Sequence, residues 1–187
     1  MIKITVRRTS RLSMRIAQNG DVHVSVPYGV GKAEVMQFIE KNKAWIAKAQ
    51  KRRKESLQQR SDFYAQLPLE TTLQRVQATQ RLTPLIKQLV EHYAKLIGVQ
   101  PKHITFKPTI SRWGCCYTRT ATLCFSLYLL LLPEWCIEHV VVHELVHLLV
   151  PNHSPAFYDL MDRYFPRWRE ARKTTQMISQ GALTKQS

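Results

Sequence analysis

The sequence predicts an α+β fold, in which short strands and longer helices follow one another along the chain. Residues 2–7 and 22–26 alternate strictly between apolar and polar side chains, a pattern typical of half-exposed strands. Apolar stripes of helical period begin at Lys32 and recur over residues 83–97. A further apolar segment, residues 133–150, carries two histidines four positions apart. We therefore expect a small basic β-rich module and a long helix, followed by a domain built around the histidine helix.

The N-terminal module is expected to span residues 1–60. Residues 12–16 repeat the strand pattern, and Asn19-Gly20 ahead of the next strand is a dipeptide typical of a tight hairpin turn. The long helix that follows has an apolar stripe, which includes Val35, Ile39 and Trp45. The module is thus predicted to be a small sheet followed by an amphipathic helix.

Positive charge is concentrated in this module. The formal net charge of the chain is +15, and residues 1–60 hold 14 lysines and arginines against 4 acidic residues. Such a field attracts polyanions, including nucleic acid. The cluster Lys51, Arg52, Arg53 and Lys54 is the candidate nucleic-acid or anion-binding site. The alternative is a solvated helix end with cations at the terminus that favours them.

Residues 61–80 are predicted to be a linker or a connecting helix, because they are polar and contain the Leu67-Pro68 break. The second domain should span residues 81–173. Its first helix, over residues 83–97, has Pro84 in a position that suits a first turn and Gly98 in one that suits a helix end. The polar residues 174–187 predict a flexible tail.

Residues 104–107 and 121–127 read as two strands, which we expect to form a small antiparallel sheet beside the histidine helix. The segment between them supplies three candidate substrate-binding residues, Arg112, Trp113 and Cys116. An edge strand here can pair with an extended peptide. Arg112 can hold an anionic group or stack on Trp113, and Cys116 can line the cleft or pack inertly; the sequence leaves these alternatives open.

The motif His143-Glu144-Leu145-Val146-His147 carries the chemistry. Histidines four apart on a helix lie on one face, about 6 Å apart along the axis, so both imidazoles can reach one metal ion. Glu144 points sideways from the pair, where it can take a proton from a metal-activated water. This is the zincin arrangement of two metal ligands and a general base.

His153 is the candidate third ligand. Pro151 disfavours helix in the residue before it, so the histidine helix should stop near Val150. Ser154-Pro155 suits the N-cap and first position of a new helix. A turn between the two helices can bring His153 back to the metal and leave a fourth position open.

Several motifs together resemble a known family. They are R-W-G-C-C at residues 112–116, L-C-F-S at 123–126, H-E-L-V-H at 143–147 and N-H-S-P-A-F at 152–157, with K-A-W-I at 43–46. They are similar to the YgjP-like metallopeptidases, which are related to SprT-type and WLM-type zinc proteases and to compact gluzincins. The resemblance implies a zincin-like fold, with His143, His147 and His153 as zinc ligands and Glu144 as catalytic base.

We expect a zinc-dependent hydrolase, with a metallopeptidase acting on protein or peptide substrates as the leading hypothesis. Manganese, cobalt or nickel are also compatible with imidazole ligands. The first alternative is a metal-dependent phosphohydrolase of nucleoside triphosphates, in which the basic surface attracts the nucleotide. The second is a nucleic-acid-associated protein with a structural metal.

A cytoplasmic location is expected, with no membrane partner. The N-terminus lacks the continuous apolar core of a signal peptide, and the longest apolar run, residues 127–132, is too short to span a bilayer. The cysteines show no C-x-x-C spacing, and we expect reduced thiols.

Overall fold

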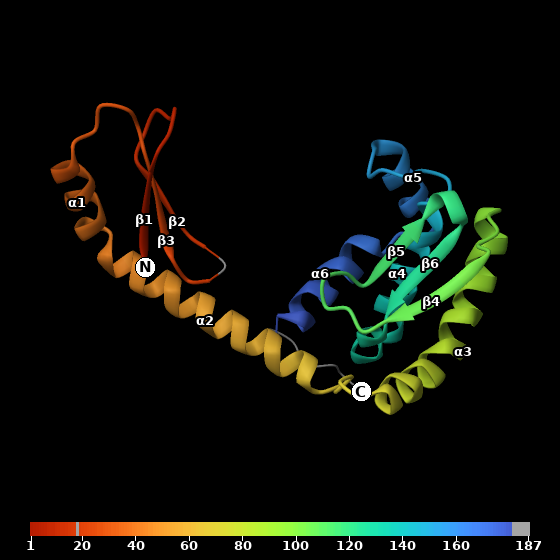
Figure 1. Ribbon diagram of the computed structural model, residues 1–187. Coiled ribbons are helices and arrows are strands. Elements are labelled where there is room, and N and C mark those ends of the chain that lie inside the picture. The colour runs from red at the N-terminus through yellow and green to blue at the C-terminus, as the bar shows by residue number, and fades with distance from the viewer. Residues whose placement is uncertain (18, 181–187) are drawn as a thin grey trace. The chain divides into compact units, whose positions relative to one another are not determined.

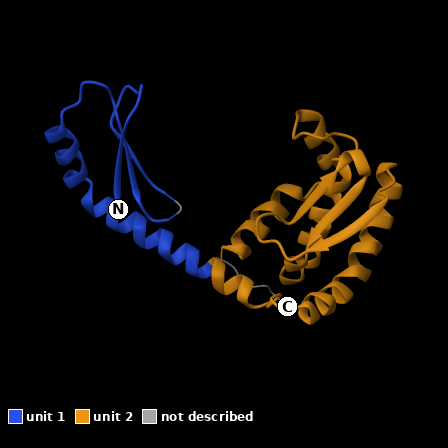
Figure 2. Ribbon diagram, viewed as in Figure 1, with its two compact units in different colours: residues 1–59 blue, residues 60–187 orange. Residues whose placement is uncertain are grey.

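The computed structural model describes residues 1–17 and 19–180 (Figure 1). The chain divides into two compact units, Met1–Gln59 and Arg60–Ser187 (Figure 2). The predicted α+β class is confirmed: each unit combines a three-stranded sheet with helices. None of the helices in the described part of the chain is long and apolar enough to cross a membrane.

Unit 1 is a small mixed sheet with a helix. Strands β1 (Ile2–Val6), β2 (Ser13–Ile16) and β3 (Val22–Val26) lie in the order β1-β3-β2. β3 runs parallel to β1 and antiparallel to β2. The alternation in β3 buries Val22, Val24 and Val26, and these pack with Val35 and Ile39 of helix α1 (Lys32–Lys41). The predicted strands are therefore present, whereas the predicted single long helix is divided at Asn42 into α1 and a second helix, and Trp45 of its expected apolar stripe is exposed.

Helix α2 (Lys43–Ala65) follows α1 after a single residue, Asn42, whose side-chain amide donates to the carbonyl of Phe38 at 2.7 Å. The helix continues past the predicted start of the linker at residue 61. Its last turns belong to unit 2, where Phe63 is buried in the core. Burial of this aromatic ring explains why the polar composition of the segment did not end the helix.

Helix α3 (Thr72–Ile97) begins earlier than the predicted residue 83. A capping box starts it: the Thr71 hydroxyl accepts from the Gln74 N–H, and the Gln74 side chain accepts from the Thr71 N–H. Pro84 therefore lies inside the helix and costs it one hydrogen bond. Burial of Ala78 and Leu82 in the helix before Pro84 offsets that loss. Gly98 ends α3 in the left-handed conformation, as predicted.

The sheet of unit 2 is mixed, whereas the sequence predicted a purely antiparallel one. Strands β4 (His103–Lys107), β5 (Gly114–Tyr117) and β6 (Thr122–Ser126) lie in the order β4-β6-β5. β6 pairs in parallel with β4 and antiparallel with β5. The difference arises because the R-W-G-C-C block continues into an additional strand, which no apolar alternation marks. Two 3₁₀ segments, Thr118–Thr120 and Leu127–Leu131, flank β6.

Helix α4 (Glu134–Val146) is the centre of unit 2. It packs against α3, β5, α5 (Pro155–Tyr164) and α6 (Trp168–Ser179). Residues on every side of it are buried, among them Ile137, Val141, Val142 and Leu145. A helix enclosed in this way has little solvent-facing surface, so its polar side chains must be accommodated inside the protein.

Helix α6 corrects the predicted tail. Residues 174–179 are helical, and Thr175 and Ile178 are buried. The segment is polar overall, but its few apolar residues recur at helical spacing and face α4. The rest of the predicted tail, residues 181–187, lies outside the described residues.

A hydrogen bond between α3 and α4 provides a test of this packing. The Tyr93 hydroxyl donates to Glu138 Oε1 at 2.5 Å, and burial, together with this carboxylate, raises the pKa of Tyr93. We predict that Tyr93→Phe lowers the free energy of unfolding by about 1–2 kcal/mol, measured by urea titration. Tyr117→Phe, at an exposed tyrosine, should change it little. An equal loss in both variants would contradict this role for the hydrogen bond.

Candidate active site

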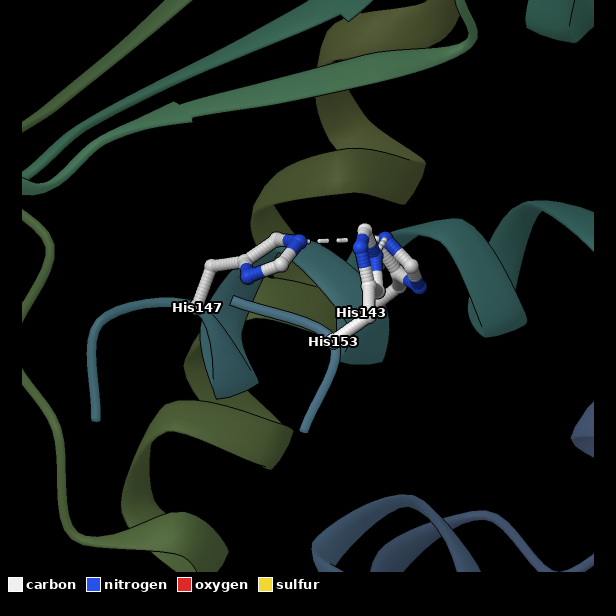
Figure 3. A group of neighbouring side chains, drawn as sticks. All are labelled: His143, His147 and His153. Atoms are coloured by element: carbon white, nitrogen blue, oxygen red, sulfur yellow. Dashed lines mark hydrogen bonds between the residues drawn. The ribbon is translucent and has the colours of Figure 1, made fainter. Parts of the chain in front are cut away.

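Three histidines converge at the C-terminal end of α4 (Figure 3). His143 lies in the last turn of the helix, and His147 is its C-cap. His153 comes from the connection to α5, just before the N-cap Ser154. The Nε2 atom of His143 lies 3.2 Å from that of His147 and 3.1 Å from that of His153. The three ligand nitrogens thus point toward one position.

The donor set fits a divalent transition metal. Burial, followed by the neighbouring histidines, lowers the pKa of His143 to about 3, which favours the neutral imidazole that metals bind. His147 Nδ1 lies 3.1 Å from the Val150 carbonyl oxygen. Donation from Nδ1 to this oxygen would leave the Nε2 lone pair free for a metal. Three imidazoles at these distances match the ligand number of a catalytic zinc site, which keeps one position open.

Glu144 is enclosed beside this cluster. Its side chain is 5% exposed. In the metal-free protein, burial raises the pKa of Glu144 to about 8, and the charge of Arg112 lowers it in part. A buried carboxylate of this kind is costly unless a cation or a hydrogen-bond donor compensates it. A metal bound by the neighbouring histidines would be such a cation.

Gly114 makes room for this carboxylate. A methyl group built on Gly114 would lie 2.5 Å from Glu144 Oε1 and 2.6 Å from Glu144 Cγ. These separations are shorter than real contacts, so only glycine fits here without displacing the glutamate. The first residue of β5 therefore fixes where the Glu144 side chain can lie.

A cavity of about 650 Å³ opens next to these groups. Its lining includes His143, Glu144 and His153, together with the predicted contacts Arg112 and Trp113. Its volume is within the range of ligand-binding clefts. The structure thus brings five of the predicted residues to one cleft.

The model of the YgjP-like metallopeptidase domain matches residues 10–69 and 64–176, which is most of the chain. The chain belongs to the YgjP-like metallopeptidase family. No significant match was found among curated proteins.

Two solved structures of metallopeptidase zymogens are similar to about half of this YgjP-like chain. Abylysin of Pyrococcus abyssi is 24% identical, with a TM-score of 0.44, over 49% of this chain and 94% of that one. Jannalysin of Methanocaldococcus jannaschii is 22% identical, with a TM-score of 0.45, over 52% of this chain and 97% of that one.

The remaining predicted residues of this YgjP-like chain do not line the cavity. Cys116 does not line the cavity; burial, followed by the Glu144 charge, raises the pKa of its thiol to about 11. Lys51, Arg52, Arg53 and Lys54 lie in α2 and belong to unit 1, whereas every lining residue of the cavity belongs to unit 2. Of the two alternatives for Arg112, stacking on Trp113 is absent from the described cation–π contacts. Trp113 packs instead against Phe63 and Tyr64.

Sequence analysis missed several residues of the cleft. His139 lines the cavity one turn before His143, and its Nδ1 is buried without a hydrogen-bond partner among the described residues. Its spacing from His143 and His147, four and eight residues, would have placed it on the same helix face. Arg172 of α6 also lines the cavity, together with Tyr158 and Trp168. No local pattern identifies these three, because tertiary packing brings them to the cleft.

The Gly114 contact generates a prediction. We expect Gly114→Ala to lower peptide hydrolysis by about a hundredfold, because the new methyl group displaces the Glu144 carboxylate. Zinc affinity, measured by competition with a chelating dye, should stay within a few-fold because no histidine is touched. Gly31→Ala is the matched control, since a methyl group there meets no atom within 4 Å. Full activity in Gly114→Ala would refute the constraint.

Proposed function

We propose that this chain is a zinc-dependent peptidase in which His143, His147 and His153 hold the metal and Glu144 is the general base. The observation that carries the proposal is the convergence of three Nε2 atoms beside a buried glutamate at one cavity. A structural zinc usually takes four protein ligands, whereas the described cluster offers three. Membership of a metallopeptidase family supports peptide bonds, rather than nucleotides, as the substrate.

In the proposed reaction the metal would supply Lewis acidity toward water and the substrate carbonyl. Glu144 would accept the proton of the attacking water on its carboxylate and pass it to the leaving amine. The absence of a side chain at Gly114 leaves the space that the Glu144 carboxylate occupies for both transfers. The apolar enclosure around α4 would limit competing water at the carboxylate.

Strand β5 is the proposed substrate guide. Among the described strands it pairs only with β6, so its second edge can accept hydrogen bonds from an extended peptide. Gly114 at its start touches Glu144, so a peptide on this edge would pass the general base. Arg112 and Trp113, which directly precede β5, are the proposed side-chain contacts.

Zinc is the proposed metal, and manganese, cobalt and nickel also suit imidazole donors. A cytoplasmic setting is proposed as well. It is supported by four cysteines that are all free thiols, as a reducing compartment favours.

Substitution of the base and of a ligand should separate two effects. We predict that Glu144→Gln lowers peptide hydrolysis at least about a hundredfold and leaves bound zinc unchanged. His143→Ala should lose both zinc and hydrolysis, because one of three ligands is removed. His92→Ala, at an exposed histidine of α3, should lose neither. Zinc content by mass spectrometry and cleavage of a casein substrate measure the two effects, and hydrolysis by Glu144→Gln close to the wild-type rate would exclude Glu144 as the base.

A second function is proposed for unit 1, the binding of nucleic acid. Lys3, His23 and Arg15 lie opposite one another across the three strands, on the sheet face away from the valine core. Lys51, Arg52 and Lys54 are exposed on α2. These two groups of cations favour contact with phosphates, and among the described residues only Lys51 of the three on α2 has a carboxylate nearby, Glu55 at 3.9 Å.

Salt dependence provides the measurement. The affinity of the full chain for a fluorescent 20-base-pair DNA should fall as salt rises, because phosphate contacts release counterions. Replacement of Lys51, Arg52 and Lys54 by Gln should weaken binding and lower the slope of log affinity against log salt. Replacement of Lys87, Lys95 and Lys102, which lie in unit 2, is the charge-matched control. An affinity independent of salt would contradict this function.

A further inference from the structure

Two arginines face the cavity from different elements. Arg112 lies just before β5, and Arg172 lies on α6. Within the described part of the chain, neither guanidinium forms a salt bridge or a hydrogen bond. The neighbouring arginines of α6 differ: Arg167 pairs with Glu170 and Arg169 pairs with Asp162. Among the described residues, Arg112 and Arg172 are therefore exposed cations that line the cavity without an ion-pair partner.

These arginines dominate the charge of the cavity. Glu144 is the sole carboxylate among the lining residues. The field of Arg112 reaches Glu144, and the field of Arg172 reaches His139 and His143. The two arginines therefore outnumber the single carboxylate on the lining of the cavity.

Aromatic side chains complete the walls beside the two cations. The rings of Tyr158 and Trp168 are stacked, with centroids 5.1 Å apart and an angle of 21° between their planes. Together they form an apolar ledge on the α5–α6 side of the cavity, and Trp113 lies on its lining as well. A ligand with an apolar body and an anionic group matches such a lining.

We propose that this cavity is a carboxylate-selecting subsite, in which Arg112 and Arg172 bind a peptide carboxylate close to the bond that is cleaved. Guanidinium groups bind carboxylates through paired, charge-assisted hydrogen bonds. The same lining repels lysine and arginine side chains of a substrate, which adds specificity. The biological meaning of this subsite rests on the proposed peptidase function. The carboxylate comes either from an aspartate or glutamate side chain or from the C-terminus of the peptide.

Peptide binding tests the subsite without requiring turnover. The zinc-loaded full chain carrying Glu144→Gln is titrated against fluorescein-labelled Ala-Ala-Phe-X-Ala-Ala, where X is Glu or Gln and the C-terminus is free or amidated. Fluorescence anisotropy gives four dissociation constants. The peptides with a carboxylate should bind roughly tenfold more tightly than the neutral one, as expected for a hydrogen bond to a charged group. Tight binding that follows X identifies the side chain, and tight binding that follows the free terminus identifies the C-terminus.

Matched variants separate the cavity from the overall positive charge. Arg112→Gln and Arg172→Gln, each added to Glu144→Gln, should reduce the preference for a carboxylate at least threefold. Lys173→Gln removes the same charge from an exposed neighbour on α6 that does not line the cavity, and it should retain the preference. Equal loss in all three variants, or no preference in the parent protein, would overturn the subsite. Far-UV circular dichroism verifies that each variant is folded.

Cleavage of a mixed peptide library distinguishes this inference from the function on which it rests. Cleavage with Asp or Glu enriched next to the cut, or with cuts at a fixed distance from the C-terminus, supports both. Cleavage without either pattern overturns the subsite and leaves the peptidase intact. No cleavage, together with selective binding in the anisotropy assay, overturns the peptidase function and leaves the subsite.

Discussion

The close approach of three imidazole nitrogens at the end of α4 is the constraint on which the rest of unit 2 depends. The Nε2 atom of His143 lies 3.1 and 3.2 Å from the other two Nε2 atoms, and the three cannot all satisfy one another by hydrogen bonds. A cation shared by the three nitrogens would satisfy them, and the end of the helix at His147 allows His153 to return to the cluster. The enclosure of α4 by α3, α5, α6 and β5 holds these side chains in register. The same enclosure buries Glu144, whose carboxylate a cation at this position would stabilise.

The contact between Gly114 and Glu144 connects the helix to the sheet. It places the start of β5 beside the proposed general base, and among the described strands β5 pairs only with β6. The metal-binding histidines, the proposed base and the proposed substrate guide therefore meet at one junction between two elements. Arg112 and Arg172 add positive charge to the cleft beside this junction. The proposed peptidase would therefore favour peptides that carry a carboxylate close to the cleaved bond.

Local sequence patterns were enough to predict the metal-binding histidines, because their spacing along the chain identifies them. His143 and His147 are one helical turn apart, and Pro151 and Ser154-Pro155 define the turn that carries His153. Contacts between segments distant in the sequence could not be predicted from local patterns. Gly114 and Arg172 reach the cleft through tertiary packing, and β5 shows no apolar alternation that would reveal a strand. The predicted ends of two helices were wrong for a related reason. Burial of Leu82 and Ile178 extends α3 and α6 through polar stretches of the sequence.

A crystal structure of the zinc-loaded full chain, with anomalous diffraction at the zinc edge, tests the central claim most directly. The account predicts one strong peak about 2.0–2.1 Å from the Nε2 atoms of His143, His147 and His153, with the Glu144 carboxylate outside the ligand set. A peak on the cysteines, a site without His153, or direct coordination by Glu144 in place of a histidine would contradict it.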